Sequence, residues 1–465
     1  MAAPTQSPAA VPWHFFATHR RCPFAFFIDR AADPRLSFAG SRPREQLVID
    51  ADGLASTWCE GTWHRAGGDP LDHIAAFVER SRARPAALPA WLDGETLPRT
   101  VGFLAYELRH WTDAPAQRRR GCTRAARDAV GTPLAVLSTY DEVDVWDSRS
   151  GRSVRVRLAP ATRHADPPAL PAPAPAAWTA TTREAYRRGF EHIREAIAAG
   201  EIYQANLSRR AVFDHEEDAA DAYARLREVQ PVPWGAFLDF GGFALLSNSP
   251  ECFLERHGDV VVTRPIKGTR GRGGDTPSDA AERAALRSDP KEMAEHLMIV
   301  DLERNDLGRV ARTGSVEVTW LATVESFATV HHMVSEVRAL LREGTSLGAL
   351  LRATFPGGSI TGAPKLRAME ILAEVEATER GPYTGAVGFF NGADEIEMSI
   401  AIRTAVASNG RVLYSTGGGI VADSDPDREW DETELKLAAL RTALAAAPRR
   451  AKSSPAGQCK AGVNR

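Results

Sequence analysis

The chain has 465 residues, enough for one large domain or two intertwined ones. Hydrophobic residues make up 43% and charged residues 25%, as in ordinary globular proteins, and a formal net charge of −3 argues against a nucleic-acid-binding surface. Five scattered cysteines without CxxC spacing argue against a zinc site and indicate a reducing compartment. No stretch reaches transmembrane length and no secretory signal opens the chain, so we expect a cytoplasmic protein without membrane contact.

The first third of the chain is predicted to consist mainly of strands. Residues 1–12, rich in proline and alanine, are predicted to be disordered. Residues 13–158 contain short apolar runs between Gly, Pro and Asp, which is typical of strands, with one helix at 70–83. Residues 159–178 contain six prolines and many alanines, and we interpret them as a linker.

Residues 179–447 combine helices with strands, and residues 448–465 are predicted to be a loose tail. A capping box that begins at Thr181 predicts a helix that ends at Gly200, and Asp289 predicts the start of another. Further helices are predicted near 346–354, 364–376 and 426–446, and strands near 384–391, 395–405 and 411–416. Strands interleaved with long helices indicate an α+β fold with a large antiparallel sheet.

A lysine in an apolar setting is the first candidate for chemistry. Lys267 lies in the stretch PIKGT, between apolar residues and a Gly-Thr turn. Such a lysine can lose its proton because burial disfavours the charged form, and the free amine is a nucleophile. Lys267 is therefore our candidate catalytic nucleophile.

Two predicted helices each carry a pair of glutamates three residues apart. The pairs are Glu292 with Glu295 and Glu429 with Glu432, and Lys436 lies one turn beyond the second pair. Residues at this spacing share one face of a helix, and ligand sets made only of oxygen favour Mg²⁺ over zinc or copper. Either pair alone is better explained as solvated charge. Two pairs near helix starts, where the dipole favours carboxylates, indicate a shared Mg²⁺ site.

Two glycine-rich stretches have different explanations. Residues 357–365, GGSITGAPK, lack the Lys-Ser/Thr that a phosphate-binding P-loop requires, which excludes that class of nucleotide site. Gly417 to Gly419 follow the predicted strand at 411–416. Consecutive glycines can direct backbone N–H groups onto an anion, and they can equally form a simple turn, so both explanations stay open.

Three further polar residues also have two explanations each. His332, in an apolar stretch, is by itself more typical of a hydrogen-bonded core histidine than of a catalytic one. Glu251 follows a strand and a proline, and is either an exposed turn carboxylate or a general acid whose pKa burial raises above ~4.3. Arg403 alternates within a predicted strand and faces either a cavity or water.

Together these stretches resemble the chorismate-utilising enzymes, a family that includes anthranilate, isochorismate, salicylate and aminodeoxychorismate synthases. Residues 179–445 contain, in family order, IYQANLS, LLSNSPE, PIKGT, KEMAEHLMIVDLERNDLGRV, HHMVS, FPGGSITGAPK, GAVGFF, IAIRT and GGGIVADSDP. The first part matches more loosely, through PRLSFAGSRP and VGFLAYEL. The resemblance implies two large antiparallel sheets packed in an orthogonal sandwich, helices outside, and an active site in a cleft.

The resemblance also implies a role for each candidate residue. It implies that Mg²⁺ is held by Glu295 and Glu432, with Glu292 and Glu429 in support through water, and that Glu251 is the general acid. It places His332, Thr361 and Arg403 around chorismate, and assigns the carboxylates of chorismate to Gly418, Gly419 and Lys436.

Two positions select a reaction within the family. Members that add water carry a lysine base where this chain has Gln204, and a glutamine cannot deprotonate water, which disfavours isochorismate and salicylate synthesis. Where this chain has PIKGT, anthranilate synthases have a stretch similar to PIAGT, without the lysine. Aminodeoxychorismate synthases carry a lysine at this position, and the resemblance to them implies that Lys267 forms a covalent bond with the substrate. We therefore expect Mg²⁺-dependent amination of chorismate at C4, in the 4-aminobenzoate (folate) pathway or a related one, with anthranilate synthase component I as the alternative.

The amino group is expected to come from ammonia. None of the cysteines lies in the Gly-x-Cys-x-Gly elbow of a glutaminase, so we expect a separate glutamine amidotransferase subunit as partner. The stretch AFFID differs from the Leu-Leu-Glu-Ser type of stretch in members that bind tryptophan, so the resemblance does not extend to feedback by tryptophan. A non-catalytic metal- or nucleic-acid-binding protein is the alternative from another class, which the acidic pI disfavours.

Overall fold

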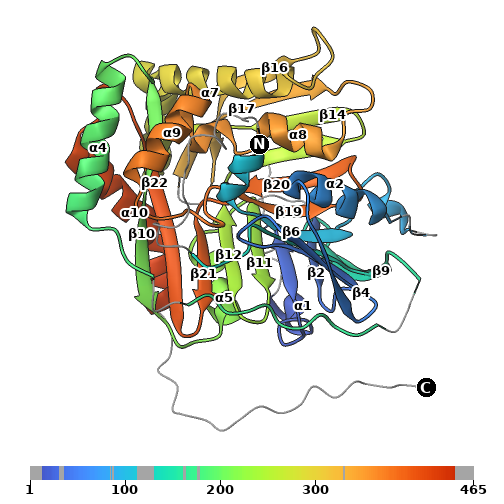
Figure 1. Cartoon of the computed structure of the whole chain (residues 1–465). Coiled ribbons are helices and arrows are strands. Elements are labelled where there is room, and N and C mark those ends of the chain that lie inside the picture. The colour runs from blue at the N-terminus through green and yellow to red at the C-terminus, as the bar shows by residue number, and fades with distance from the viewer. Residues whose placement is uncertain are drawn as a thin grey trace.

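The computed structural model describes residues 13–30, 36–83, 85, 88–112, 130–160, 164–174, 178–327 and 330–445 (Figure 1). The strands are β1 (Phe26–Asp29), β2 (Leu36–Gly40), β3 (Glu45–Ile49), β4 (Ala55–Cys59), β5 (Thr62–Ala66), β6 (Thr100–Leu104), β7 (Ala135–Thr139), β8 (Glu142–Asp147), β9 (Arg152–Arg157), β10 (Gln204–Asp214), β11 (Trp234–Asp239), β12 (Ala244–Ser249), β13 (Cys252–His257), β14 (Val260–Arg264), β15 (Ile266–Gly271), β16 (Glu317–Ser326), β17 (Val330–Leu340), β18 (Gly362–Ala363), β19 (Ala386–Phe390), β20 (Glu395–Ile400), β21 (Thr404–Ser408) and β22 (Arg411–Ile420). The helices are α1 (Trp13–Ala17), α2 (Pro70–Arg80), α4 (Arg183–Ala198), α5 (Ala219–Val229), α6 (Thr276–Ser288), α7 (Pro290–Gly308), α8 (Leu347–Thr354), α9 (Lys365–Val375) and α10 (Pro426–Ala445), with 3-10 turns η1 (Ala90–Leu92), η2 (Tyr106–Trp111) and η5 (Gly358–Ile360).

Two antiparallel sheets form the centre of the molecule. One has ten strands in the order β18-β10-β22-β21-β12-β11-β1-β2-β8-β9. The other has twelve, in the order β15-β17-β14-β13-β20-β19-β6-β7-β3-β4-β5, with β16 paired to β17. In Figure 1, β10, β22, β21 and β12 run up the page, whereas β14, β19 and β6 run mostly across it. The prediction of an α+β fold with two large antiparallel sheets and helices outside is confirmed.

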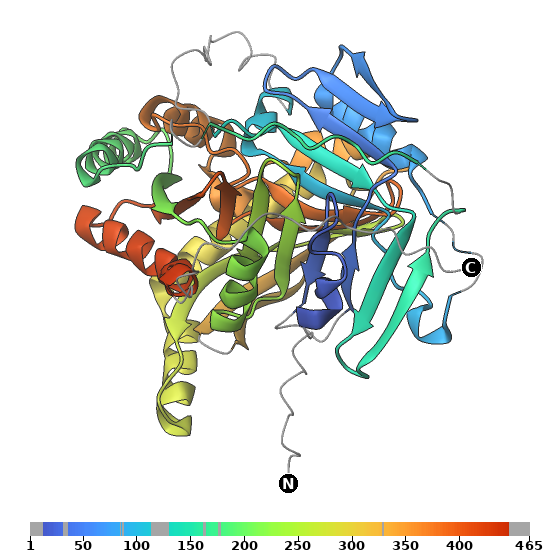
Figure 2. The same ribbon diagram turned by 90° about the horizontal axis from the view of Figure 1, so that it is seen from below.

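Strands from both sides of residues 159–178 pair within the same two sheets. β1 lies beside β11 and β6 lies beside β19, so the N-terminal strands, blue to cyan in Figure 2, extend both sheets. The proline-rich stretch packs over the turn after β11, where the N–H of Leu170 donates to the carbonyl of Phe240 over 2.9 Å. It therefore joins two parts of one sheet system. Residues 1–12 and the tail at 448–465 lie outside the described residues.

The hydrophobic core lies between the sheets and beneath the helices on both outer faces. Between the sheets, Phe38 of β2 meets Phe389 of β19, and Phe103 of β6 meets Phe240, each pair with ring centroids 5.4 Å apart. Helices α2, α7 and α8 cover the outer face of the twelve-stranded sheet, and α1, α5 and α10 cover that of the ten-stranded sheet. Burial of these apolar faces is the main source of stability, because it removes hydrocarbon from water.

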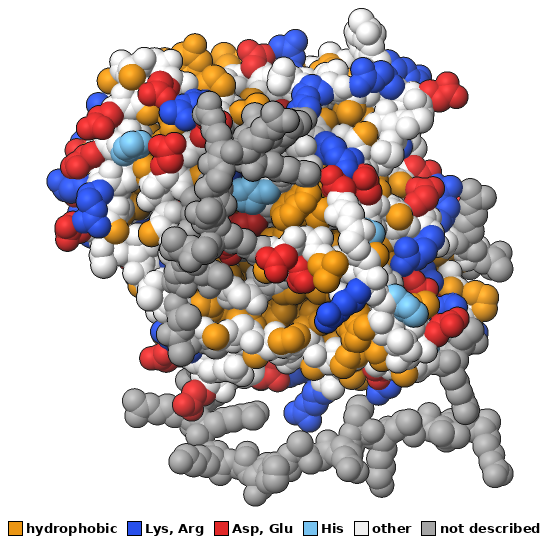
Figure 3. All heavy atoms as spheres, viewed as in Figure 1, with side chains coloured by type: hydrophobic (Ala, Val, Ile, Leu, Met, Phe, Trp, Pro, Cys, Tyr) orange, Lys and Arg blue, Asp and Glu red, His pale blue; other side chains and the backbone are white. Residues whose placement is uncertain are grey.

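Helix α4 covers the β10 edge and shows how the helices face outward. Its buried stripe contains Tyr186, Phe190 and Ile193, as predicted from their spacing. On the outer side Arg188 and Glu184, one turn apart, pair at 2.6 Å. Figure 3 shows such charged side chains gathered at the left edge of the molecule, where α4 lies. The helix is therefore amphipathic, with its charges in solvent.

The predicted capping box of α4 is wrong by one residue. The hydroxyl of Thr182, not that of Thr181, accepts from the N–H of Ala185 and caps the helix. Thr181 is unavailable because its hydroxyl accepts from the N–H of Arg210 over 3.0 Å. Gly200 follows the helix end with φ +73°, as a C-terminal glycine should.

Two strand predictions also need correction. Residues 395–405, predicted as one strand, form β20 in the twelve-stranded sheet and β21 in the ten-stranded one. The chain crosses between the sheets at residues 401–403, where Arg403 has φ +52°, so Arg403 is not within a strand. Gly417 to Gly419 lie inside β22, paired to β10, rather than after it. Helices α5 and α6 were not predicted.

Replacement of Phe389 with alanine is expected to lower the free energy of unfolding by about 3–5 kcal/mol, because it leaves a cavity at the contact between the sheets. Leu435→Ala is the control, since Leu435 is 74% exposed. Its expected change is within about 0.5 kcal/mol. Urea unfolding followed by circular dichroism measures both variants, and equal losses would contradict the packing described.

Candidate active site

The candidate residues meet where an edge of one sheet approaches the other sheet. Lys267 lies in the edge strand β15, and Gln204 and Gly419 lie in the neighbouring strands β10 and β22 of the ten-stranded sheet. A Cβ atom built on Gly419 would lie 2.8 Å from Nε2 of Gln204 and 3.3 Å from Nζ of Lys267. Three segments that are distant in the chain therefore share one site, and a side chain at position 419 would displace the ends of Gln204 and Lys267.

A bulge at Gly268 shapes this edge of the twelve-stranded sheet. Lys267 and Thr269 pair with consecutive residues of β17, the partner of Thr269 being His332, so β15 has one extra residue. Gly268 has φ +80°, which glycine adopts without strain. A Cβ on Gly268 would lie 3.2 Å from Oε2 of Glu292, so α7 packs directly on the bulge. The predicted Gly-Thr turn is thus a bulge within a strand.

The side-chain amide of Gln204 is fully buried, and neither its oxygen nor its nitrogen is hydrogen-bonded to any described residue. Leaving such a buried group without a partner costs about 1–3 kcal/mol. Because the amide adjoins Gly419 and the Lys267 amine, a bound molecule can supply the missing hydrogen bonds. This is the property expected of a residue that contacts the substrate.

Glu251 is a buried carboxyl between β12 and β13, so the explanation as an exposed turn carboxylate is wrong. Its Oε1 accepts from the N–H of Ile266, the residue before Lys267, over 3.4 Å. Burial raises the pKa of Glu251 to about 7, against the opposing effects of the Ser359 hydroxyl and the charge of Lys267. A carboxyl with this pKa holds a proton near neutrality, which is the state that a general acid needs.

Helices α7 and α10 bring their glutamate pairs toward the same region. Asp289 caps α7 by accepting from the N–H groups of Lys291 and Glu292, as predicted for a helix start. Lys291 pairs with Asp423, which precedes α10, at 3.1 Å, and so ties the two helix starts together. The result is an acidic region bordered by Lys267.

The four glutamates differ in their surroundings. Burial raises the pKa of Glu292, Glu295 and Glu429. A carboxylate of the facing helix adds to the rise for Glu292 and for Glu295, whereas Glu432 of the same helix adds to it for Glu429. Glu432 is more exposed and lies 2.6 Å from Lys436. Burial acts to raise the pKa of Glu432 as well, but the ammonium of Lys436 outweighs it and holds that pKa below its usual value.

This donor set fits Mg²⁺ in its chemistry. All four side chains offer oxygen, and a divalent cation would offset the repulsion between carboxylates that adds to the effect of burial on Glu292, Glu295 and Glu429. As the side chains stand, no group of three or more acidic, histidine or cysteine residues in the described ranges is close enough to hold a metal ion. The predicted Mg²⁺ site therefore stays a prediction that requires the carboxylates to converge.

Lys436 and the glycines of β22 join α10 to the ten-stranded sheet. Nζ of Lys436 donates to the carbonyl of Gly417 over 2.8 Å. A Cβ on Gly418 would lie 2.9 Å from Oε2 of Glu429, so the absence of a side chain lets the acidic helix approach the strand. The glycines therefore act at least through close packing, and their predicted contact with substrate carboxylates remains a prediction.

His332 and Thr361 occupy different parts of the site. Nδ1 of His332 is hydrogen-bonded to the hydroxyl of Thr269 at 2.9 Å, and burial together with the charge of Arg403 lowers the pKa of His332 to about 4, so the ring is neutral. The hydroxyl of Thr361 donates to the carbonyls of Gly357 and Gly358 at 3.1 Å and so holds its own loop. Neither contact tests the predicted contact with substrate.

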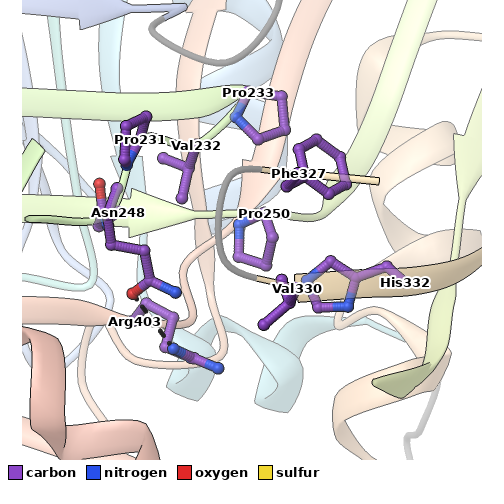
Figure 4. A pocket seen from close by; sticks show the side chains of 10 residues that line it. Pro231, Val232, Pro233, Asn248, Pro250, Phe327, Val330, His332 and Arg403 are labelled. Atoms are coloured by element: carbon purple, nitrogen blue, oxygen red, sulfur yellow. Dashed lines mark hydrogen bonds between the residues drawn. The ribbon is translucent and has the colours of Figure 1, made fainter. Parts of the chain in front are cut away.

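Arg403 and His332 line an open pocket (Figure 4). Its apolar walls are Pro231, Val232, Pro233, Pro250, Phe327 and Val330. Nη1 of Arg403 donates to Oε1 of Gln230 over 3.4 Å, the dashed line in Figure 4. The guanidinium therefore borders a cavity, which is one of the two predicted settings, the other being water. It does so from the crossing between the sheets and not from within a strand.

Sequence reasoning missed a buried charged row on α7 behind the site. Glu303 accepts from the N–H of Gly358 over 2.8 Å, and Asp306 forms an ion pair with Lys365. Lys365, the last residue of GGSITGAPK, also donates to the carbonyl of Pro356 over 2.8 Å and so supports the glycine loop. The only clue in the sequence was helical spacing, which continues the face of Glu292 and Glu295 along α7.

A model of the chorismate-binding enzyme family matches residues 33–442 of this chain. The chain belongs to that family. This chorismate-binding enzyme is 36% identical over 452 residues to anthranilate synthase component 1 1 of Haloarcula marismortui, covering 89% of this chain and 90% of the relative. It is 42% identical over 365 residues to an aminodeoxychorismate synthase of Streptomyces griseus, covering 73% of this chain and about half, 49%, of that relative.

Solved structures show the same fold. Anthranilate synthase component I from Streptococcus pneumoniae superimposes with a TM-score of 0.72 at 27% identity, covering 88% of this chain and 92% of the other. The predicted family is therefore confirmed, while the relatives carry the names of two different reactions. Among the described residues of this chorismate-binding enzyme, no helix is long and apolar enough to cross a membrane.

Glu251→Gln is expected to change how stability depends on pH. The pKa of Glu251 is about 7 in the folded chain against an ordinary value of 4.5. The folded state thus binds the proton more tightly, so the stabilisation is complete below the ordinary value and is lost as the pH rises through the folded one. The parent chain should lose about 3 kcal/mol relative to E251Q across this window.

Urea unfolding at a series of pH values measures this difference. The control is Glu184→Gln, because the Glu184 side chain is 83% exposed and its loss should leave the pH dependence parallel to that of the parent chain. A pH-independent difference between the parent chain and E251Q would show that Glu251 titrates normally.

Proposed function

We propose that this chain aminates chorismate at C4, so that chorismate and ammonia give 4-amino-4-deoxychorismate and water. The main support is the position of Lys267, a nucleophilic side chain whose amine lies beside Gly419 and Gln204. Amination at C2 needs no nucleophile from the enzyme, because ammonia can attack C2 directly. A lysine at this place is explained by amination at C4, where nitrogen must enter at the carbon that loses the hydroxyl.

In the first half-reaction the deprotonated amine of Lys267 attacks C2 of the ring. The C2–N bond forms, both ring double bonds shift, and the C4–O bond breaks. Glu251 gives its proton to the departing hydroxyl, which leaves as water. The pKa of about 7 supports this role for Glu251, because it leaves a proton to donate near neutral pH.

In the second half-reaction ammonia, which is supplied by solvent or by a partner protein, attacks C4. The double bonds shift back, the C2–N bond breaks, and Lys267 leaves as a free amine. The new ammonium returns one proton to the Glu251 carboxylate, so the enzyme regains its starting state. The two displacements place the new nitrogen where the hydroxyl was.

The remaining residues hold the substrate in this scheme. Arg403, beside the pocket of Figure 4, is a cation for one carboxylate of chorismate, and Lys436 is a cation for the other. The unpaired amide of Gln204 supplies a neutral hydrogen-bonding partner. Neutral His332 orients the ring without adding charge. Glu295 and Glu432, supported by Glu292 and Glu429, would hold Mg²⁺, which when bound offsets the negative charge of the substrate.

We further propose that ammonia reaches the site from a glutamine amidotransferase subunit. The support is the name "component 1" carried by the Haloarcula relative and "component I" by the Streptococcus structure, which describe one part of a larger synthase. Free ammonium is the substitute substrate when the chain acts alone.

Anthranilate synthase component I is the second candidate function. The names of these same relatives favour it. In that reaction ammonia enters at C2 and the ring becomes aromatic after loss of the enolpyruvyl side chain. The two functions differ in product, since anthranilate fluoresces and 4-amino-4-deoxychorismate needs a lyase before it becomes 4-aminobenzoate.

Lys267→Ala and Lys267→Arg test the covalent role. With chorismate, Mg²⁺ and ammonium, both variants are expected to lose 4-amination by about 10³-fold or more, because neither side chain is a usable nucleophile. Liquid chromatography with mass detection measures the 4- and 2-aminated products. Arginine keeps the positive charge, so substantial 4-amination by K267R would reduce Lys267 to an electrostatic role.

The parent chain without ammonia offers a second readout of the same prediction. Its mass should increase by chorismate minus one water, with the adduct at Lys267, and neither variant should gain it. Lys291→Ala is the control because Lys291 pairs with Asp423 at the surface of α7. K291A should still form the adduct.

The source of ammonia is tested with the purified chain. Ammonium should support amination, and glutamine alone should support it at least about 100-fold less well, because nothing in the proposed site hydrolyses an amide. Addition of a glutamine amidotransferase subunit should restore use of glutamine. Efficient use of glutamine by the chain alone would contradict the proposed partner.

A further inference from the structure

A second buried carboxyl, Glu303 of α7, lies behind Glu251. Its Oε1 accepts from the N–H of Gly358 over 2.8 Å, and its Oε2 accepts from the hydroxyl of Thr263 over 3.4 Å. The N–H of Ser359 also favours its charged form. The two backbone N–H groups can only donate, so they favour a carboxylate over a protonated acid.

Ser359 acts on both carboxyls. Its backbone N–H favours the charged form of Glu303 and its hydroxyl favours that of Glu251, but the hydroxyl is hydrogen-bonded to none of the described residues. The negative charge of Glu303 acts on Glu251 and makes ionisation of Glu251 less favourable. The two carboxyls therefore belong to one electrostatic pair.

The surrounding charges decide which member of the pair holds the proton. Lys365 of α9 stabilises negative charge on Glu303 and is also bound to Asp306 of the same helix as Glu303. Glu251 faces Lys267 of β15, but receives only the long 3.4 Å bond from the N–H of Ile266. Burial raises the pKa of both carboxyls. The larger set of donors leaves the charge on Glu303 and the proton on Glu251.

We propose that Glu303 is a positioning residue of the reaction, which holds the negative charge of the buried pair and so keeps Glu251 protonated for donation to the departing hydroxyl. This inference rests on the proposed function, in which Glu251 is the general acid. None of the roles assigned to other residues requires Glu303, whose position on α7 otherwise serves only to bind the backbone of η5.

The test is an infrared titration of the Glu251 carboxyl. In the parent chain, the band of protonated Glu251 is obtained by subtracting the spectrum of E251Q. In the E303Q variant, it is obtained by subtracting the spectrum of the double variant E303Q/E251Q. Glu303→Gln keeps the shape and removes the charge, so the titration midpoint of Glu251 should fall by about one pH unit. An unchanged midpoint in folded E303Q would overturn the proposal and leave Glu303 as a backbone-binding residue.

Two further variants separate charge from structure. Glu303→Asp keeps the charge and should hold the midpoint closer to that of the parent chain than E303Q does. Glu255→Gln removes another buried carboxylate, paired with Arg264 at 2.7 Å, and should leave the midpoint unchanged. If E303Q does not fold, E303M takes its place as a charge-free variant of similar length, and the same midpoint decides.

Kinetics give an independent readout that depends on the proposed function. With ammonium as donor, turnover by E303Q should be near that of the parent chain at pH 5 and about tenfold lower at pH 8, since the protonated fraction of Glu251 falls with its midpoint. If the midpoint of Glu251 shifts in E303Q but the parent chain does not aminate chorismate at C4, the two carboxyls are coupled and the proposed reaction is wrong. A shifted midpoint with an unshifted pH profile would reject the role of Glu303 in catalysis.

Discussion

Removal of charged and polar groups from water at the junction of two sheets is the constraint on which this molecule depends. Glu251 and the amide of Gln204 are buried there, and Lys267 lies half-buried beside Gln204. Burial of a charged or polar group without a partner costs stability. Aromatic contacts between the sheets, such as Phe38 with Phe389, contribute the free energy that offsets this desolvation. The size of the two sheets is therefore tied to the chemistry, because a small core could not hold so many polar groups dry.

The sheets also explain the precision of the site. Lys267 stands on a strand with a bulge, Gly419 on a strand of the other sheet, and Arg403 at the crossing from one sheet to the other. Lys267 and Gly419 are thus held by strands, and Arg403 by a short crossing between two strands. The starts of helices α7 and α10 are joined by the ion pair between Lys291 and Asp423.

Helix α7 has two electrostatic roles along its length. Its first turns place Glu292 and Glu295 near Lys267, where neighbouring carboxylates add to the rise of their pKa values. Its last turns carry Glu303 and Asp306 into the core, where Lys365 and the N–H of Gly358 oppose the rise in pKa that burial causes. Both groups lie along α7, the first beside Lys267 and the second buried in the core.

Much of this protein follows from local pattern in the chain. Motifs in a constant order identified the family, cap signals near Thr181 and at Asp289 located α4 and α7, and residue chemistry singled out Lys267 and the four glutamates. Each of these signals is contained in a few consecutive residues. Folding alone settled that β20 and β21 belong to different sheets, that Gly417 to Gly419 lie inside a strand, and that Glu251 is buried with Glu303 behind it. Sheet membership and the pKa of a carboxyl depend on neighbours that are far away in the chain, and no local pattern contains them.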